Sequence, residues 1–189
     1  MTEASTTSRE TELSLEGDWN SIYVDGEWRE ASHLDRDDDQ NPTTEEPFAE
    51  IPIGTEEEVN EAFEAATAAQ EEWANTTPDE RAKVVHEVAD LMEEYYDEIA
   101  ELLAVEGGSA PSKVTIELGG AITFVQDAAQ FSFRMHGRHN QSKIPGKENL
   151  IYRQPVGTVG VISPWNVPLK LSIRAVAPAI ATGNTAVLK

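Results

Sequence analysis

Apolar positions in the last part of the chain follow first a strand pattern and then a helical one. Residues 158–162 form a short, β-branched run bounded by Gly and by Ser-Pro, which predicts a buried strand. Residues 168–180 begin with Pro, which a first helical turn tolerates, and their apolar side chains recur at helical spacing. Gly183-Asn184 predicts the helix end, and residues 185–188 predict a second buried strand. This order is typical of a βαβ unit with parallel strands, so we expect an α/β fold.

Turn and capping signals upstream are local and specific. Asp25-Gly26 lies between short apolar runs and suits a tight hairpin turn with positive φ. Thr55 with Glu58, and Thr77 with Glu80, have the spacing of capping boxes. We therefore expect an amino-terminal hairpin followed by two helices that begin at these threonines.

Three amphipathic helices are expected upstream of the βαβ unit, and their apolar stripes are interpreted as core-packing faces rather than cofactor sites. Gly119-Gly120 falls in the middle of the third helix, where each Gly costs about 1 kcal/mol relative to Ala. That cost suggests close approach of another helix, or a kink. The expected elements are a hairpin over 22–28, a solvated acidic loop over 35–39, an edge strand over 48–53, helices starting at 55, 77 and 111 and ending by 76, 107 and 136, and a β-arm over 138–156 turning at Pro145-Gly146.

Polar groups follow both strands of the predicted βαβ unit. In open parallel sheets, ligands bind beyond the carboxyl ends of the strands. Ser163, Pro164, Trp165 and Asn166 follow the first strand, and Lys189 follows the second. Two interpretations remain open: a ligand site, or a loop whose Trp packs and whose Asn makes a turn.

Several short motifs of the chain occur in the order of a known family. The most specific lie between Pro155 and Lys189, and the similarity covers nearly everything after about Asn20. The chain thereby resembles the aldehyde dehydrogenase superfamily. The motifs are Tyr23-Val24-Asp25-Gly26-Glu27-Trp28, Pro78-Asp79-Glu80-Arg81-Ala82, Pro145-Gly146-Lys147-Glu148-Asn149, Arg153-Gln154-Pro155-Val156-Gly157, Ile162-Ser163-Pro164-Trp165-Asn166, Pro168, Ala177-Pro178-Ala179, Gly183-Asn184-Thr185 and Val187-Leu188-Lys189.

This resemblance implies a Rossmann-like parallel-sheet cofactor domain, NAD or NADP as cofactor, and oxidation of an aldehyde substrate to a carboxylic acid. It implies that Asn166 is catalytic, as a side-chain donor to the oxyanion. It also implies that Ile162, Ser163, Pro164 and Trp165 line the adenosine side of the cofactor site and that Lys189 donates to the ribose hydroxyls. A solvated strand-end cation is the alternative for Lys189.

The resemblance also bears on substrate and domain organisation. Residues 171–178 are similar to members acting on aromatic aldehydes, whereas Val167 stands where many members carry Phe, and Lys170 follows, so a wider or differently charged substrate entrance is expected. The expected organisation is an acidic disordered tail over 1–17, a hairpin and helices over 18–137, the β-arm over 138–156 and the start of the NAD(P)-binding sheet over 157–189. In the family the matching arm joins subunits, which implies a homo-oligomer.

The chain contains no Cys. The family's nucleophilic Cys and general-base Glu lie downstream of the matched residues, so we expect an amino-terminal portion, from a truncated gene, a split gene or a partial sequence, that is inactive alone. The alternative is a non-catalytic remnant that binds a nucleotide weakly or only pairs with another subunit. Absence of Cys also excludes disulfides and suits a cytoplasmic protein.

Charge is strongly acidic and unevenly distributed. The formal net charge is −21, with −27 over residues 1–109 and +6 over residues 110–189. Nucleic acids and anionic membranes require basic patches, so neither is expected as a partner. Adaptation to high salt, where screening reduces self-repulsion, and simply solvated helix faces both account for the acidity.

Other features exclude further classes of protein. The amino terminus has no basic and apolar signal-peptide regions, and no run approaches the ~18 apolar residues of a membrane span. His136 and His139 are not accompanied by other residues in a ligand pattern, so no metal site is expected.

Overall fold

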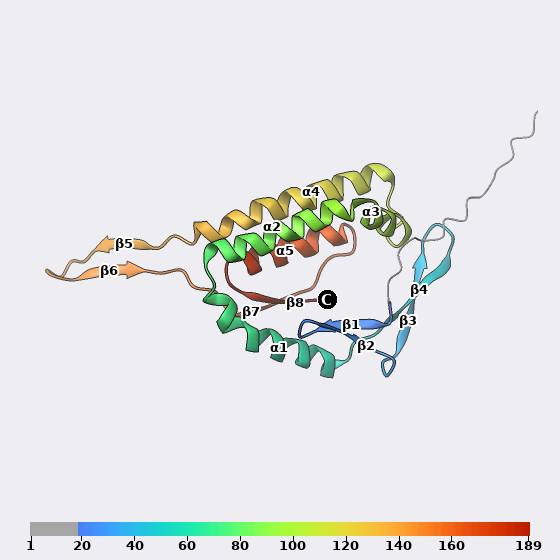
Figure 1. Cartoon of the computed structure of the whole chain (residues 1–189), viewed down its shortest axis with the longest axis horizontal. Helices are drawn as coiled ribbons and strands as arrows, with labels where there is room; N and C mark the ends of the chain where they lie inside the picture. Colours follow the sequence, from blue (N-terminus) through green and yellow to red (C-terminus); the bar gives the residue numbers. More distant parts are fainter. Residues whose placement is uncertain (1–18) are drawn as a thin grey trace, which may run out of the picture.

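The computed structural model describes residues 19–189, and the predicted tail over 1–17 lies outside them. Four two-stranded sheets, five α-helices and one 3₁₀ helix make up the described chain. Figure 1 shows a helical body from which one long hairpin projects. The elements are β1 (Ser21–Val24), β2 (Glu27–Glu30), β3 (Arg36–Asn41), β4 (Glu46–Pro52), α1 (Glu56–Ala74), α2 (Pro78–Glu94), α3 (Tyr96–Val105), α4 (Pro111–Ala129), η1 (Gln130–Arg134), β5 (Arg138–Gln141), β6 (Glu148–Ile151), β7 (Thr158–Val161), α5 (Pro168–Ala181) and β8 (Thr185–Leu188).

The predicted βαβ unit is present, since β7 and β8 pair in parallel and α5 connects them. The strand pair lies between α1 on one side and α5 on the other, and α2 and α4 pack beyond α5 (Figure 1). Gly160 permits the close approach of α1, because a Cβ there would come 3.0 Å from the ring of Phe63. The resulting layer order, helix, parallel strands, helix, confirms the α/β architecture expected from the sequence.

The hydrophobic core lies among α2, α4 and α5. Leu118 and Val125 of α4 are completely buried, and small residues of α2 and α5 pack around them. Of the Gly119-Gly120 pair, only Gly120 reflects close packing, because a Cβ there would lie 2.7 Å from Lys170 Nζ of α5, whereas a Cβ on Gly119 would meet nothing within 4 Å. The amphipathic stripes predicted for α2, α4 and α5 thus form one core, with Ala at many of the closest contacts. Its buried members are Ala82, Val85, Ala89, Met92, Leu118, Ala121, Ile122, Val125, Ala128, Ala129, Ala177 and Ala181.

The local signals read from the sequence are confirmed. Asp25 and Gly26 adopt φ of 57° and 78° in the turn between β1 and β2, the left-handed conformation that the Asp-Gly pair tolerates. Thr55 and Thr77 cap α1 and α2, and both capping boxes are complete. These elements depend on interactions within four residues.

Three boundaries differ from the sequence predictions. The acidic loop predicted over 35–39 is wrong, because residues 36–41 form β3 and pair with β4; Asp37 and Asp38 stay exposed, whereas Asp39 is half-buried. The second helix is divided at Tyr95, the cap between α2 and α3. The third helix ends at Ala129 and continues as the 3₁₀ turn η1, so it does not reach His136.

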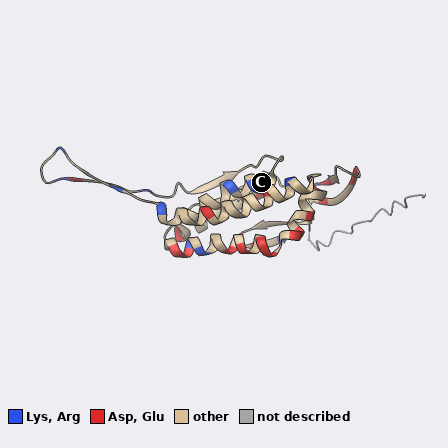
Figure 2. Cartoon of the chain, turned by 90° about the horizontal axis from the view of Figure 1, so that it is seen from above, with Lys and Arg blue, Asp and Glu red and all other residues tan. Residues whose placement is uncertain are grey.

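The projecting hairpin β5–β6 matches the predicted arm. Its strands pair from Arg138–Ile151 to Gln141–Glu148, and the turn contains Gly146 with φ of 78°. All eight strand residues are exposed. Figure 2 shows acidic residues concentrated on the body, whereas most of the charged residues of the arm are basic. The other domain boundaries expected from the sequence stay predictions.

Candidate functional site

The carboxyl ends of β7 and β8 bring the two predicted site segments together. The Lys189 N–H donates to the Val161 carbonyl at 2.9 Å, and the Ser163 N–H donates to the Lys189 carbonyl at 3.5 Å. These bonds extend the parallel ladder by one step beyond Leu188. The loop 163–167 therefore starts directly beside the backbone of Lys189.

Most side chains of this loop point away from the core. Ile162 is 84% exposed and Trp165 88% exposed, and Pro164, Asn166 and Lys189 are exposed as well. The interpretation of Trp165 as a packed loop residue is therefore wrong for the described chain. Asn166 has no side-chain hydrogen bond to another described residue, which leaves its amide available as a donor.

Two hydroxyl groups fix the far end of the loop. Ser163 Oγ donates to the Pro168 carbonyl at 3.3 Å, and Ser172 Oγ donates to the same carbonyl at 2.7 Å. Helix α5 begins at Pro168, after Val167, which has no side-chain capping bond. The loop is thus closed over the first turn of α5.

Glu117 of α4 supplies the cap that Val167 lacks. Its side chain is fully buried, and Oε1 accepts from the Leu169 N–H at 3.0 Å. Sequence reasoning missed this residue. The available signal was an acidic residue between Val114 and Leu118, on a helix face expected to be apolar. Residues 110–189 contain only three acids, so an acid there stands out.

The other end of α5 is held by side chains from the opposite layers. Arg81 Nε donates to the Ala181 carbonyl at 3.2 Å and Ser132 Oγ donates to it at 2.8 Å. Trp73 Nε1 donates to the Ile180 carbonyl at 3.0 Å. Burial lowers the pKa of the Arg81 guanidinium, against a smaller opposing effect of Glu80. A cation at this helix end also complements the helix dipole.

Asn184 ties the start of β7 to the end of α5. Its Oδ1 accepts from the Val156 N–H at 2.6 Å and from the Gly157 N–H at 3.1 Å. Its Nδ2 donates to the Ala179 carbonyl at 3.2 Å and to Thr182 Oγ1 at 2.9 Å. The sequence predicted only a helix end here, whereas the buried amide sets the register at which β7 enters beside β8.

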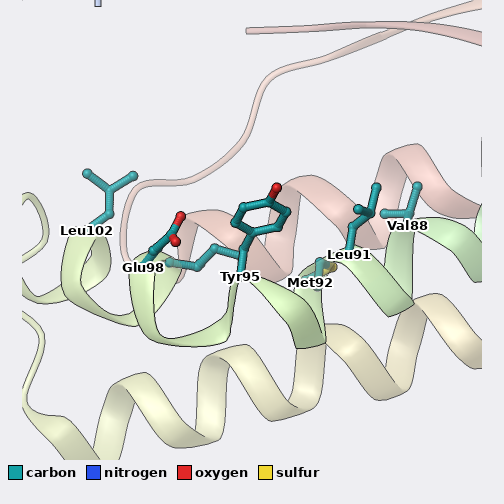
Figure 3. Close-up of a pocket in the computed structure, with 7 residues that line it drawn as sticks. Val88, Leu91, Met92, Tyr95, Glu98 and Leu102 are labelled. Atoms are coloured by element: carbon teal, nitrogen blue, oxygen red, sulfur yellow. The ribbon is translucent and has the colours of Figure 1, made fainter. Parts of the chain in front are cut away.

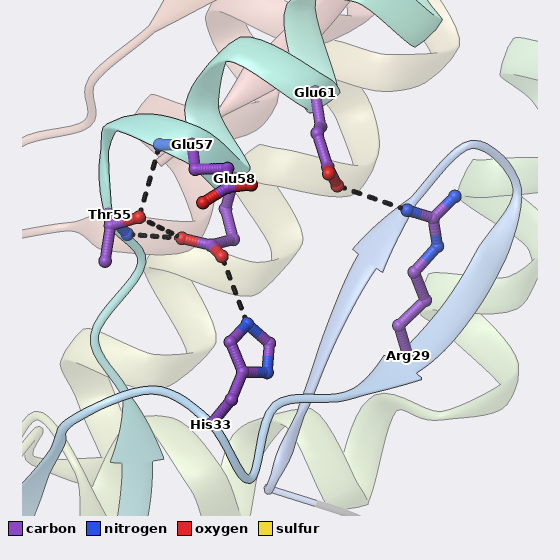
Figure 4. A network of polar contacts seen from close by, with 6 residues as sticks. All are labelled: Arg29, His33, Thr55, Glu57, Glu58 and Glu61. Atoms are coloured by element: carbon purple, nitrogen blue, oxygen red, sulfur yellow. Dashed lines mark hydrogen bonds and ion pairs between the residues drawn. The ribbon is translucent and has the colours of Figure 1, made fainter.

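A second polar cluster lies at the start of α1 (Figure 4). Hydrogen bonds from the Thr55 side chain, then from its backbone, and then from His33 lower the pKa of Glu58 to about 2. His33 Nε2 lies 3.2 Å from Glu58 Oε1, and Arg29 lies 3.4 Å from Glu61. The cluster joins the β1–β2 region to α1, so its role is to hold the amino-terminal hairpin in place.

Two acidic groups are perturbed in the opposite direction. Burial raises the pKa of Glu106, and the neighbouring charge of Asp39 raises it further. Burial also raises the pKa of Asp39. The two carboxylates lie near each other, one at the end of α3 and one on β3, and their charges repel. Within residues 19–189 there is no cluster of three His, Asp or Glu that could hold a metal ion.

An apolar groove runs along the outer side of α2 and α3 (Figure 3). Part of the stripe predicted to be core lies here in solvent, with Leu91 51% and Tyr95 46% exposed. Its lining carries a single acid, Glu98, and no arrangement of catalytic groups. No helix among residues 19–189 has the length and apolar character needed to cross a bilayer. Among the described residues, the exposed polar side chains suited to ligand binding lie at the β7–β8 edge rather than in this groove. The groove is lined by Val88, Leu91, Met92, Tyr95, Glu98, Ile99 and Leu102.

Comparison with known proteins gives one consistent result. The profile of the aldehyde dehydrogenase family matches residues 28–189. Vanillin dehydrogenase of Corynebacterium glutamicum is 44% identical over 166 residues, which are 88% of this chain and 34% of that protein. Benzaldehyde dehydrogenase YfmT of Bacillus subtilis is 37% identical over 170 residues, 90% of this chain and 35% of that protein. The chain thus spans about a third of the length of the curated relatives that it matches.

Solved structures agree with the sequence relatives. The crystal structure of an NAD-dependent benzaldehyde dehydrogenase from Corynebacterium glutamicum superposes with a TM-score of 0.87 at 42% identity, covering 92% of this chain and 38% of that one. A betaine aldehyde dehydrogenase from Staphylococcus aureus in complex with NAD⁺ gives a TM-score of 0.88 at 31% identity, covering 94% of this chain and 36% of that one. The likeness therefore extends over nearly all of the described fold.

Proposed function

Because this chain belongs to the aldehyde dehydrogenase family, we propose that its β7–β8 edge serves an NAD(P)-dependent oxidation of an aldehyde to a carboxylic acid. The supporting observation is the pairing of Ser163 with Lys189, which sets the loop 163–167 beside the second strand end. Ligands of parallel sheets bind at this edge. The relatives act with NAD or NADP, and both remain candidates for this chain.

The residues at this edge fit the adenosine part of a nicotinamide nucleotide. Ile162 and Trp165 offer exposed apolar surface for a flat heterocycle. The exposed ammonium of Lys189 can donate to ribose hydroxyls, and Ser163 and Pro164 complete the lining. A nicotinamide held by the complete site accepts the hydride that leaves the aldehyde carbon.

Asn166 is proposed as a donor to the substrate oxygen. When a thiolate adds to the aldehyde carbon, the carbonyl oxygen becomes an oxyanion that aimed N–H groups stabilise. The Asn166 amide is exposed, free of other partners in the described chain, and cannot titrate. No Cys occurs in the 189 residues, so the attacking thiolate has to come from outside them.

An aromatic aldehyde is the proposed substrate class. Support comes from the relatives named vanillin dehydrogenase and benzaldehyde dehydrogenase. Residues 171–178 carry the same similarity within α5. Val167 lies half-buried next to Asn166 and leaves more room than Phe there, whereas Lys170 reaches across to Gly120 of α4. We therefore propose that Val167 changes the shape of the substrate entrance and that Lys170 does not add a charge to it.

Cofactor binding can be tested on the 189-residue chain itself. NAD and NADP are titrated while tryptophan fluorescence is followed, and Trp165→Phe should remove most of the quenching. Trp28→Phe is the matched control, because Trp28 is also exposed, at 72%, but belongs to β2. Lys189→Gln should weaken binding about tenfold, the loss expected for one charge-assisted hydrogen bond. Equal quenching in both Trp variants contradicts the proposed cofactor edge.

Catalysis requires a protein that also carries the nucleophile. The 189-residue chain alone should produce no reduced cofactor from an aldehyde panel, and turnover that survives purification contradicts this. In a catalytically complete protein, Asn166→Ala should lower kcat by ~10²–10³ with little change in cofactor Kd. Loss of cofactor binding with unchanged kcat would instead identify Asn166 as a turn residue.

Subunit pairing is a second candidate role, supported by the projecting arm. Leu150, Ile151 and Tyr152 are 54%, 50% and 74% exposed on or next to β6, and adjoining exposed apolar residues of this kind are typical of interaction sites. We propose that the arm joins copies of this chain into a homo-oligomer. Replacing residues 139–150 by a short Gly-Ser turn should shift the sedimentation coefficient to that of a monomer. An unchanged assembly state rejects the arm as the contact.

A further inference from the structure

Glu117 stands out because it is the one buried acid among the described residues. Its side chain has no exposed surface, and burying a carboxylate is costly unless it is paired and hydrogen-bonded. Oε1 accepts from the Leu169 N–H at 3.0 Å. Oε2 has no hydrogen bond and lies 3.4 Å from Nζ of Lys113, a side chain that is 40% exposed. Because burying this carboxylate costs folding free energy, we expect Glu117 to have a role that compensates for it.

The beginning of α5 depends on this remote carboxylate. Helices α1 and α2 are capped by threonines in their own sequence. In α5 the N-cap residue Val167 provides no side-chain acceptor and Pro168 has no N–H, so the first donor to be satisfied is that of Leu169. Glu117 reaches it from α4, 52 residues earlier in the chain. A negative charge at this end also interacts favourably with the helix dipole.

Asn166 lies only three residues before the amide that Glu117 holds. The loop 163–167 is held at its beginning by the Ser163 N–H on Lys189, and Ser163 Oγ joins this beginning to the Pro168 carbonyl at the start of α5. The bond from Glu117 is the one contact of this set that comes from the helical core. We propose that Glu117 is a positioning residue that fixes the loop 163–167, and with it the direction of the Asn166 amide.

This inference rests on the proposed function for the meaning of Asn166, but the positioning itself is measurable without cofactor or substrate. Glu117→Leu removes the acceptor while filling the buried space. Glu117→Gln keeps an acceptor oxygen and removes the charge. Lys113→Met removes the neighbouring ammonium and leaves the Leu169 bond intact. Glu80→Ala is the control, because it breaks a comparable helix start, the capping box of α2, elsewhere in the fold.

Amide hydrogen exchange of the full chain, followed by mass spectrometry, tests the positioning. In Glu117→Leu the peptides that cover 162–171 should exchange at least about tenfold faster, because a charge-assisted bond is lost locally. Glu117→Gln should accelerate them only a few-fold, since a neutral acceptor is about half as strong. Lys113→Met should accelerate them less than Glu117→Leu does, because the Leu169 bond is kept although the buried carboxylate loses its ion-pair partner. Glu80→Ala should accelerate only the start of α2.

Loop exchange that is unchanged in Glu117→Leu overturns the proposal, and so does an acceleration spread evenly over all peptides. If Glu117→Leu loses its helical circular dichroism, Glu117→Gln decides: a loop-specific increase supports positioning, and no increase or a uniform one rejects it. In a catalytically complete protein, Glu117→Leu should lower kcat without raising the cofactor KM, and should have little further effect in an Asn166→Ala background. If Asn166→Ala alone leaves kcat unchanged, the proposed function fails, whereas the exchange result stands independently.

Discussion

Replacing Asn184 should destabilise the fold more than any exposed Asn can. Its side chain makes four hydrogen bonds, to the N–H groups of Val156 and Gly157, the Ala179 carbonyl and Thr182 Oγ1, and the residue is only 6% exposed. Asn184→Ala leaves two N–H groups at the start of β7 without an acceptor. The Ala179 carbonyl keeps the bond from the backbone N–H of residue 184, at 2.9 Å.

The expected magnitude follows from the two orphaned donors. An unsatisfied buried donor costs about 1–3 kcal/mol. Val156 is 88% exposed, so water can accept from its N–H, whereas Gly157 is half-buried, so Asn184→Ala should lower the free energy of unfolding by about 1–3 kcal/mol. With an m-value of about 2 kcal/mol/M, the urea midpoint should fall by about 0.5–1.5 M. Asn184→Asp keeps the acceptor but turns a second oxygen toward the Ala179 carbonyl, so its midpoint should lie between those of the wild type and Asn184→Ala.

Urea unfolding followed by circular dichroism, at one fixed and high KCl concentration, measures these differences. Asn75→Ala is the matched control, because Asn75 also follows a helix but is exposed and makes one side-chain bond, to the Glu71 carbonyl at 2.8 Å. Its effect should stay within about 0.5 kcal/mol. If Asn184→Ala is no more destabilising than Asn75→Ala, the amide does not hold β7 in register and the reasoning from its four bonds is wrong.

Three further predictions concern charge. The pKa of Glu58 is lowered to about 2, so its ionised form stabilises the fold above the ordinary carboxyl pKa of 4.5, and this contribution is lost as pH falls through 2. The difference in urea midpoint between the wild type and Glu58→Gln should therefore shrink from pH 5 to pH 2. A difference that stays constant rejects this linkage. The pKa of Glu106 is raised, so its ionised form destabilises the fold at neutral pH. Glu106→Gln should therefore raise the urea midpoint at pH 7, and this increase should disappear below about pH 4. An increase in the midpoint that persists in acid excludes the linkage. Because residues 1–109 carry a net charge of −27, helix content should rise across a KCl series to molar salt; equal helicity and cooperative melting in dilute buffer would refute adaptation to salt.

Several elements were predictable because their signals act over a few residues. The turn at Asp25-Gly26 and the boxes at Thr55 and Thr77 need only local backbone geometry and a side chain three residues away. The βαβ unit was also predictable, since a parallel pair requires a crossover and α5 has a clear helical period. The place of the candidate site followed from the same pattern, because both strand ends must meet at one edge.

Other features depended on partners that the sequence does not mark. Strand β3 is rich in Asp, which disfavours strands, and forms because β4 offers backbone partners along an exposed edge. The division at Tyr95 and the end of α4 at Ala129 likewise have no Gly or Pro to announce them.

The sequence by itself therefore determined the fold class, the family and the segment that carries the candidate site. Only the tertiary structure decided what holds that segment. Glu117 meets Leu169 across 52 residues, Arg81 meets the Ala181 carbonyl across 100, and Asn184 meets Val156 across 28. Polar groups in a core must find partners wherever packing brings them, and packing depends on the summed burial of all layers rather than on the residues nearest in sequence.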